Sequence, residues 1–198
     1  MITNERQFVI RAMSGDVSID FNSLTVGATI TEVFAIKDFE EVRKDKRLIG
    51  IVTKRTMIRI AIDLAEYALL NFAGTKDPKC FEAIAKARKF LNGKSKVSVF
   101  IRLCDDLRDI YSTAAQISNH QSPTNRVTAM IWALSEWLRN EADGNAIRYA
   151  SLTNTEYKES MQHFWEACGP NQRNFETKRV RDYIVAIFES GEFLFDLN

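Results

Sequence analysis

Apolar residues recur at every third or fourth position through most of the chain beyond Thr56. This is the spacing of amphipathic helices, in which one face is apolar. It predicts helices over 56–72, 78–92, 97–118, 123–138, 153–169 and 173–189. The first helix is apolar around most of its circumference, so we expect it in the middle of a bundle, with Arg59, Asp63 and Glu66 as a narrow polar stripe.

Several predicted helix ends carry residues that suit helix termini. Asp77-Pro78 and Ser122-Pro123 each place a cap oxygen before a proline, whose missing N–H has no partner in the first turn of a helix. Thr153-Asn154-Thr155-Glu156 has the spacing of a capping box and predicts a further start. Gly169-Pro170 predicts an end. The short connection near Gly74 predicts that the first two helices pack antiparallel.

The first 55 residues follow a different pattern. Val17, Ile19 and Phe21 alternate with polar residues, and 25–36 is rich in Thr, Val, Ile and Phe, so two short strands are predicted here. We therefore expect a small mixed α+β appendage over 1–55 and a helical bundle domain over 56–198. The predicted fold is mainly α, a five- to six-helix bundle with this small N-terminal segment.

Composition and charge agree with a soluble helical protein. The chain has 198 residues, of which 45% are hydrophobic and 27% charged, and its 8 Gly and 3 Pro leave room for long helices. The net charge of +1 argues against a strongly basic nucleic-acid binder. The charge is uneven, because residues 51–100 carry 10 basic and 4 acidic side chains.

The cysteines and the apolar segments predict a cytoplasmic location. Cys80, Cys104 and Cys168 are odd in number and form no CxxC motif, which is typical of reduced thiols. Cys80 and Cys104 lie among apolar neighbours, so we expect them to be buried and unreactive. The first residues lack the pattern of a signal peptide, and charges interrupt the longest apolar segment, 57–72, so we expect no membrane span.

Two acidic patterns have spacings found in metal sites, but we do not expect either of them to bind a metal. Residues 105–109 fit the DDxxD pattern of prenyl-transferring enzymes, but no second acidic motif accompanies it, so a solvated helix face is the better interpretation. Glu159, His163 and Glu166 share a helix face, but the chain has only 2 histidines. Glycine-rich nucleotide motifs and GxSxG are missing from the sequence. We therefore expect no catalytic residue, no metal and no cofactor.

The candidate partner-binding residues are basic side chains and an apolar C-terminal tail. They are Lys79, Lys86, Lys89 and Lys94 in the second quarter, Lys178, Arg179 and Arg181 in the last helix, and Phe193 and Phe195 in the tail. Lys79 and Lys86 can share a helix face. Nucleic-acid binding would need stacking aromatics among these cations, and Phe81 and Phe90 fit the core pattern better.

The helical pair over 61–93 carries two short motifs. The first helix reads A-x-D-x-A-E-x-x-L and the second reads A-I-x-x-A-R-x-aromatic-x-x-G, through Ala61, Asp63, Ala65, Glu66, Leu69, Ala83, Ile84, Ala87, Arg88, Phe90 and Gly93. This pair resembles part of an immunity-protein family from bacterial polymorphic-toxin systems. The tryptophan usual in that family near the start of the first helix is missing here. The resemblance implies an all-helical, non-enzymatic inhibitor.

The charges of the first two predicted helices suggest how these helices pair. Arg59 and Asp63 are one helical turn apart, and an antiparallel hairpin brings Arg88 opposite Asp63 or Glu66. We hypothesise an ion pair between Arg88 and one of these carboxylates that fixes the register of the two helices, at a desolvation cost.

Taken together, the patterns favour a non-catalytic binding protein. It would inhibit a macromolecular partner, such as a toxin or a defence enzyme, by covering part of its surface. The alternative is a nucleic-acid-associated accessory protein that binds through the basic helix face, and an enzyme of unfamiliar type is a third hypothesis. A homodimer is also compatible with the sequence.

Overall fold

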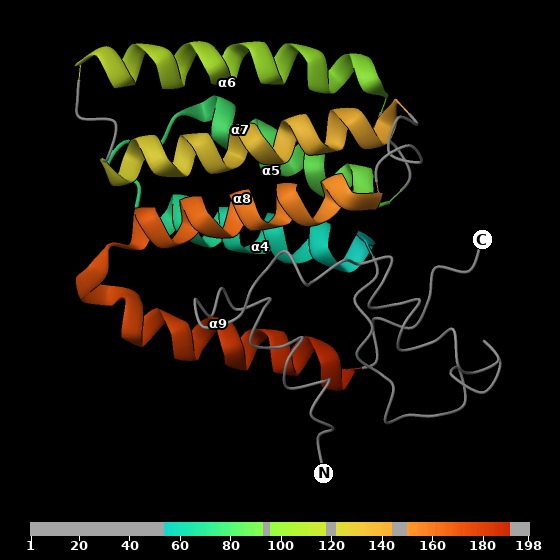
Figure 1. Ribbon diagram of the computed structural model, residues 1–198. Coiled ribbons are helices and arrows are strands. Elements are labelled where there is room, and N and C mark those ends of the chain that lie inside the picture. Colours follow the sequence, from blue (N-terminus) through green and yellow to red (C-terminus); the bar gives the residue numbers. More distant parts are fainter. Residues whose placement is uncertain (1–53, 93–95, 118–121, 144–149, 191–198) are drawn as a thin grey trace, which may run out of the picture.

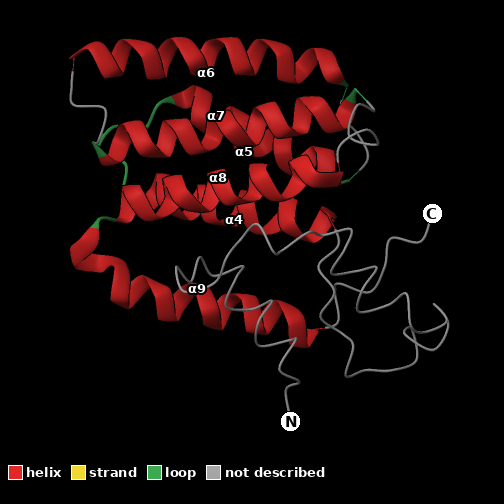
Figure 2. Cartoon of the chain, viewed as in Figure 1, coloured by secondary structure: helices red, strands yellow, loops and turns green. Residues whose placement is uncertain are grey.

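The computed structural model describes residues 54–92, 96–117, 122–143 and 150–190. The described part is almost entirely helical and contains no strand (Figure 2). Its helices are α4 (Lys54–Asn71), α5 (Pro78–Leu91), α6 (Val97–Ile117), α7 (Pro123–Ala142), α8 (Ala150–Cys168) and α9 (Pro170–Ser190). The predicted mainly-α bundle is therefore confirmed. The two predicted strands lie outside the described residues, as does the proposed appendage except for residues 54 and 55, which belong to α4.

Two of the predicted helix starts are confirmed by hydrogen bonds. The Asp77 side chain accepts the N–H of Lys79 at 2.8 Å, and α5 begins with the next residue, a proline. The Ser122 hydroxyl oxygen accepts the N–H of Asn125 at 3.2 Å, and α7 again begins with a proline. In both places a side-chain oxygen satisfies a backbone donor that the helix leaves free.

Two predicted boundaries near the C-terminus are wrong. Helix α8 begins at Ala150, so Thr153 and Glu156 lie inside it and do not cap it. No glycine or proline separates Ala150 from this motif, and the helix runs through it. Helix α9 begins at Pro170 instead of Arg173, directly after Gly169, whose φ of +75° turns the chain at the end of α8.

The helices form an antiparallel bundle with α6 along one edge and α9 along the opposite edge (Figure 1). Successive helices alternate in direction, as the colours of Figure 1 show. Helix α4 packs against α5, α7 and α8, and α7 packs against α4, α5, α6 and α8. These two central helices are covered on most sides, which confirms the expected place of α4.

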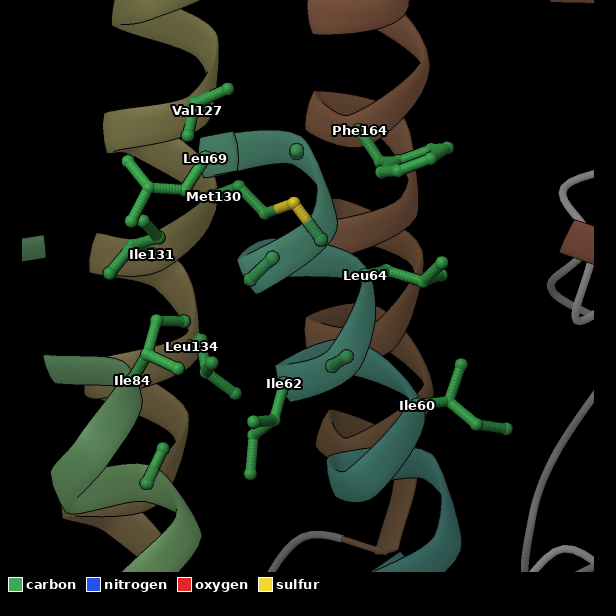
Figure 3. Close-up of a cluster of buried hydrophobic side chains, with 14 of the residues drawn as sticks. Ile60, Ile62, Leu64, Leu69, Ile84, Val127, Met130, Ile131, Leu134 and Phe164 are labelled. Carbon is green, nitrogen blue, oxygen red and sulfur yellow. The ribbon is translucent and has the colours of Figure 1, made fainter. Parts of the chain in front are cut away.

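Apolar side chains from α4, α5, α7 and α8 fill the space between the helices (Figure 3). The largest fully buried side chains are aromatic: Trp137, Tyr157, Phe100 and Phe164. Trp137 is fully buried because α7 is central and neighbouring helices cover most of its sides. Its indole N–H donates to Glu141 Oε1 at 3.2 Å.

Phe81 departs from the predicted core, and Phe90 does not. The buried face of α5 consists of Cys80, Ala83, Ile84 and Ala87. Phe81 points away from this face and is exposed, whereas Phe90 packs edge-on against Phe100 with the ring centroids 5.8 Å apart. None of the helices in the described ranges is both long enough and apolar enough to cross a membrane.

Candidate functional site

A cluster of charged and hydroxyl groups around Asp63 joins three helices. Arg88 Nη1 of α5 donates to Asp63 Oδ1 at 2.7 Å, and Arg88 Nη2 donates to Glu66, one turn further along α4. The hydroxyl of Tyr183 in α9 donates to Asp63 Oδ2, and Arg59 Nε lies 3.8 Å from the same oxygen. The hypothesised pairing of Arg88 is therefore confirmed, and it includes both carboxylates.

The surroundings raise the pKa of two hydrogen-bond donors in this cluster, Arg88 and Tyr183. Burial lowers the pKa of the Arg88 guanidinium, but its hydrogen bonds to Glu66 and Asp63 outweigh this, so the pKa is raised. Burial, followed by the bond to Asp63, raises the pKa of Tyr183 far above its ordinary value of 10.0. Tyr183 therefore remains a neutral donor and Arg88 remains a cation, which makes the cluster a structural tie between helices.

A second cluster joins α4 to α9 one turn away. The Tyr67 hydroxyl donates to Glu176 Oε1 at 3.1 Å, and Arg179 Nη1 donates to the Tyr67 oxygen. Arg179 Nε lies 3.8 Å from Glu176 Oε2. Glu176 is only 4% exposed because it stands on the face of α9 that also buries Val180 and Ile184. Burial, followed by the bond to Glu176, raises the pKa of Tyr67.

The guanidinium of Arg179 lies against two aromatic rings, those of Tyr67 and of the exposed Phe175. The guanidinium carbon of Arg179 lies 5.2 Å from the ring centroid of Tyr67 and 5.1 Å from that of Phe175. Both distances are within the range of cation–π attraction. Phe175 is 67% exposed. Arg179 is thus held by contacts on α4 and α9 while the Phe175 ring is open to solvent.

Leu70 is a second exposed apolar side chain, on α4 and near Tyr67 in the sequence. It is 51% exposed and lies one turn beyond Tyr67 on α4. Contacts of Asp63 with Tyr183 and of Tyr67 with Glu176 show that α4 and α9 are antiparallel here, so Leu70 lies toward the Phe175 end of α9. We name Tyr67, Leu70, Phe175 and Arg179 the aromatic–arginine patch.

The predicted basic face of α5 is partly neutralised. Lys79 Nζ lies 2.9 Å from Asp106 Oδ2 of α6 and 3.5 Å from Glu82 Oε2. The hydrogen bond to Asp106 is the main cause of the raised pKa of Lys79. Lys86 is half-buried and Lys89 is exposed. The face is therefore less positive than its sequence suggests, because Asp106 of the neighbouring helix α6 pairs with Lys79.

The other predicted partner-binding residues fall into two groups. Lys178 and Arg179 are exposed on α9, and Arg181 is half-buried there. Lys94, Phe193 and Phe195 lie outside the described residues. Of the predicted set, the structure therefore brings Arg179, with Lys178 beside it, to the aromatic–arginine patch.

The acidic motif in α6 has the arrangement expected of a solvated helix face. Arg108 lies 3.3 Å from an oxygen of Asp105 and 3.9 Å from one of Asp109, and Asp106 pairs with Lys79. Cations of the chain therefore already contact all three carboxylates.

Glu166 of α8 forms an ion pair with Arg126 and also contacts His163. Glu166 Oε2 lies 2.9 Å from Arg126 Nη1 and 3.3 Å from His163 Nδ1. Within the described ranges, no three His, Cys, Asp or Glu side chains are grouped so that they could hold a metal ion.

The three cysteines are buried and unpaired. Burial is the main reason that the pKa is raised to about 11 for Cys80, about 12 for Cys104 and about 11 for Cys168. Because the thiolate is the reactive form, these thiols are poor nucleophiles at neutral pH. The expectation that Cys80 and Cys104 are buried is confirmed.

Four residues of these clusters were not predicted from the sequence: Tyr67, Leu70, Phe175 and Glu176. Two signals were available on the last helix. Phe175 stands off the apolar stripe that contains Val180 and Ile184, so its ring has no place in the core. Glu176 stands on that stripe, where a carboxylate needs a partner. A helix with an apolar residue off its buried stripe and a charged residue on that stripe breaks the usual pattern, and such breaks are expected at functional sites.

Comparison with protein-family models, with curated proteins and with solved structures finds no match for this chain.

Proposed function

We propose that this chain is a non-catalytic protein that binds a protein partner through the aromatic–arginine patch and inhibits it by covering part of its surface. The observation that carries the proposal is the 67% exposure of the Phe175 ring beside Arg179, which its contacts with Tyr67, Glu176 and this ring hold in place. Contiguous exposed apolar surface is typical of sites where another molecule docks.

The residue types of the patch support a protein partner. Tyr, Phe and Arg are enriched in the centres of protein interfaces, and Tyr and Arg are frequent among the residues whose truncation costs most affinity. Arg179 is already ordered by Tyr67 and by the ring of Phe175. Less side-chain entropy is then lost on binding, which favours affinity.

An inhibitor of the immunity or counter-defence type is the form of binding protein that we favour. The resemblance of the helical pair over 61–93 to an immunity-protein family supports this form, and the patch lies partly on the first of these two helices, α4. We also propose a cytoplasmic location, because three unpaired cysteines are typical of a reducing compartment.

Position-specific photo-crosslinking tests the proposal. The photoreactive amino acid benzoylphenylalanine replaces Phe175 in one variant and Ile101 in a matched control, in cells that naturally make the chain. Ile101 is an exposed apolar residue on α6, at the opposite edge of the bundle (Figure 1). We expect one protein to crosslink at position 175 and not at position 101, and its activity to fall when the purified chain is added.

Three outcomes would overturn the proposal. Equal crosslinking at positions 175 and 101 would show that the patch has no special role. Crosslinking to nucleic acid alone would favour the accessory-protein hypothesis. A specific protein partner whose activity is unchanged by the chain would refute inhibition.

A further inference from the structure

We infer that the aromatic–arginine patch and the neighbouring Lys178 accept an acidic segment of a protein, in which a carboxylate stands close to an apolar side chain. This inference rests on the proposed function and specifies the chemistry of the partner.

The outer face of α9 is positive because one of its carboxylates is turned inward. Between residues 170 and 186 the helix carries the cations Arg173, Lys178, Arg179 and Arg181 and the acids Glu176 and Asp182. Glu176 is 4% exposed and accepts a hydrogen bond from Tyr67, so it does not face a docking molecule. Asp182 is then the one carboxylate on this stretch that is exposed to solvent.

Helix geometry places two cations next to the exposed ring. Lys178 is three residues and Arg179 four residues beyond Phe175, and residues at these spacings are neighbours on a helix surface. The Arg179 guanidinium lies 5.1 Å from the Phe175 centroid. A molecule that covers the ring must therefore bring its own groups close to two positive charges.

Lys178 is the cation best suited to a carboxylate of the partner. Arg179 already donates to Tyr67, and the guanidinium of Arg173 lies over the ring of Trp165, 5.6 Å from its centroid. Lys178 is exposed and, within the described part of the chain, has no ion pair. Lys79 on α5 is different, since Asp106 and Glu82 both lie within ion-pair distance. A carboxylate that meets Lys178 displaces no existing partner among the described residues.

The occupant is therefore anionic and partly apolar. Its apolar side chain covers Phe175 and Leu70, and its carboxylate meets Lys178. A second copy of this chain would need to supply an acidic surface of its own, and it is a separate outcome of the test. Charge complementarity of this kind selects partners and speeds association more than it adds affinity, so binding should weaken with salt.

A random peptide library displayed on phage supplies the probe. The library is selected on the immobilised full-length chain, and the enriched peptides are synthesised and titrated against the chain and three variants. The variants are Phe175→Ala, Lys178→Glu and the control Lys89→Glu, which reverses an exposed lysine on α5. We expect the enriched peptides to combine Asp or Glu with an aromatic or aliphatic residue. We expect affinity to fall about tenfold or more with Phe175→Ala and with Lys178→Glu, and little with Lys89→Glu.

The outcomes separate this inference from the proposed function. Peptides that need Phe175 but lack acidic residues, and that tolerate Lys178→Glu, would overturn the inference and leave the proposed function standing. Peptides that bind all three variants equally would overturn both. If sedimentation shows a dimer that Phe175→Ala disrupts, the occupant is a second copy of the chain. If the chain binds a labelled random oligonucleotide and Lys178→Glu abolishes this binding, the occupant is a nucleic acid. Either result would refute an acidic protein segment.

Discussion

The carboxylate of Asp63 is bonded to side chains from two other helices. Arg88 of α5 and Tyr183 of α9 each donate to one of its oxygens, and Arg59 of α4 lies close to the second. The side chain of Asp63 is only 22% exposed, so these bonds lie in a poorly hydrated region where an unpaired charge is costly. One residue thus fixes the positions of three helices.

Arg88→Ala should destabilise the fold. Asp63 and Glu66 both lose their cation, and we expect the free energy of unfolding to fall by about 1–2 kcal/mol, a value reduced by the 42% exposure of the Arg88 side chain. Denaturant titration measures this. The matched control is Arg108→Ala on α6, where the ion pairs are local and exposed, with an expected loss below about 0.5 kcal/mol. Equal losses would refute a structural role for the cluster.

The cysteines should not react in the native chain. Their pKa values are raised to about 11, 12 and 11 for Cys80, Cys104 and Cys168, so almost no thiolate forms at neutral pH. Ellman's reagent should label none of them before denaturant is added and all three afterwards. Rapid labelling of any cysteine in the folded chain would contradict the burial described here.

Sequence reasoning succeeded at residues whose partners are near in the chain. Arg88 could be paired with Asp63 because a short connection fixes the register of two neighbouring helices. Tyr183 and Asp63 are 120 positions apart, and the sequence contains nothing that determines how α9 lies on α4. Arg179 was selected for its charge alone, since the rings of Tyr67 and Phe175 become its neighbours only in the folded chain.

At the scale of helices, the sequence predicts helix boundaries best where residues within one turn determine them. Caps at Asp77 and Ser122 were predicted because a side-chain oxygen and a following proline act within one helical turn. The start of α8 at Ala150 was missed, since the capping-box spacing at Thr153 is also compatible with a helix interior. The exposure of Phe81 depends on which side of α5 faces its neighbours, which the sequence does not state.

Gly169→Ala should destabilise the junction between α8 and α9. Gly169 has a φ of +75°, a conformation that costs a residue with a Cβ about 1 kcal/mol, although no atom would clash with the added methyl group. Thermal unfolding measures the loss. Gly74→Ala is the matched control, because its Cβ would lie 3.4 Å from Thr124 Oγ1 and φ is not in the left-handed region. A loss at position 74 equal to that at 169 would contradict this explanation.

The bundle as a whole should lose stability in alkaline solution. Burial raises the pKa of Tyr157 and Tyr183 well above the ordinary value of 10.0. A group whose pKa is raised by folding stabilises the folded chain fully below its unfolded pKa, and this stabilisation is lost as the pH rises above it. Unfolding free energy should therefore fall above about pH 10, where the unfolded tyrosines ionise.

Denaturant titrations across this pH range, with tyrosinate absorbance as a second probe, check the prediction. Tyr183→Phe should make the decline with pH less steep, because one of the two tyrosines whose pKa is strongly raised is gone. Ionisation of all tyrosines near pH 10 in a chain that stays folded would show that their burial is wrong.

In the molecule as a whole, the residues that stabilise the bundle are different from the apolar residues exposed in the aromatic–arginine patch. Trp137, Phe100, Phe164 and their neighbours stabilise the bundle from inside, and Phe175 contributes little to that core because it is mostly exposed. The class of fold could be predicted because apolar spacing reports helices directly. The patch could not, since it forms where two helices distant in sequence meet.

The affinity of the crosslinked partner for the chain and for Phe175→Ala tests the central claim most directly. Calorimetric titration of both, with Ile101→Ala as the control, compares two exposed apolar residues at opposite edges of the bundle. We predict that Phe175→Ala weakens binding by about 30-fold or more with an unchanged melting temperature, while Ile101→Ala has little effect. Equal affinities for Phe175→Ala and the unaltered chain would contradict the account.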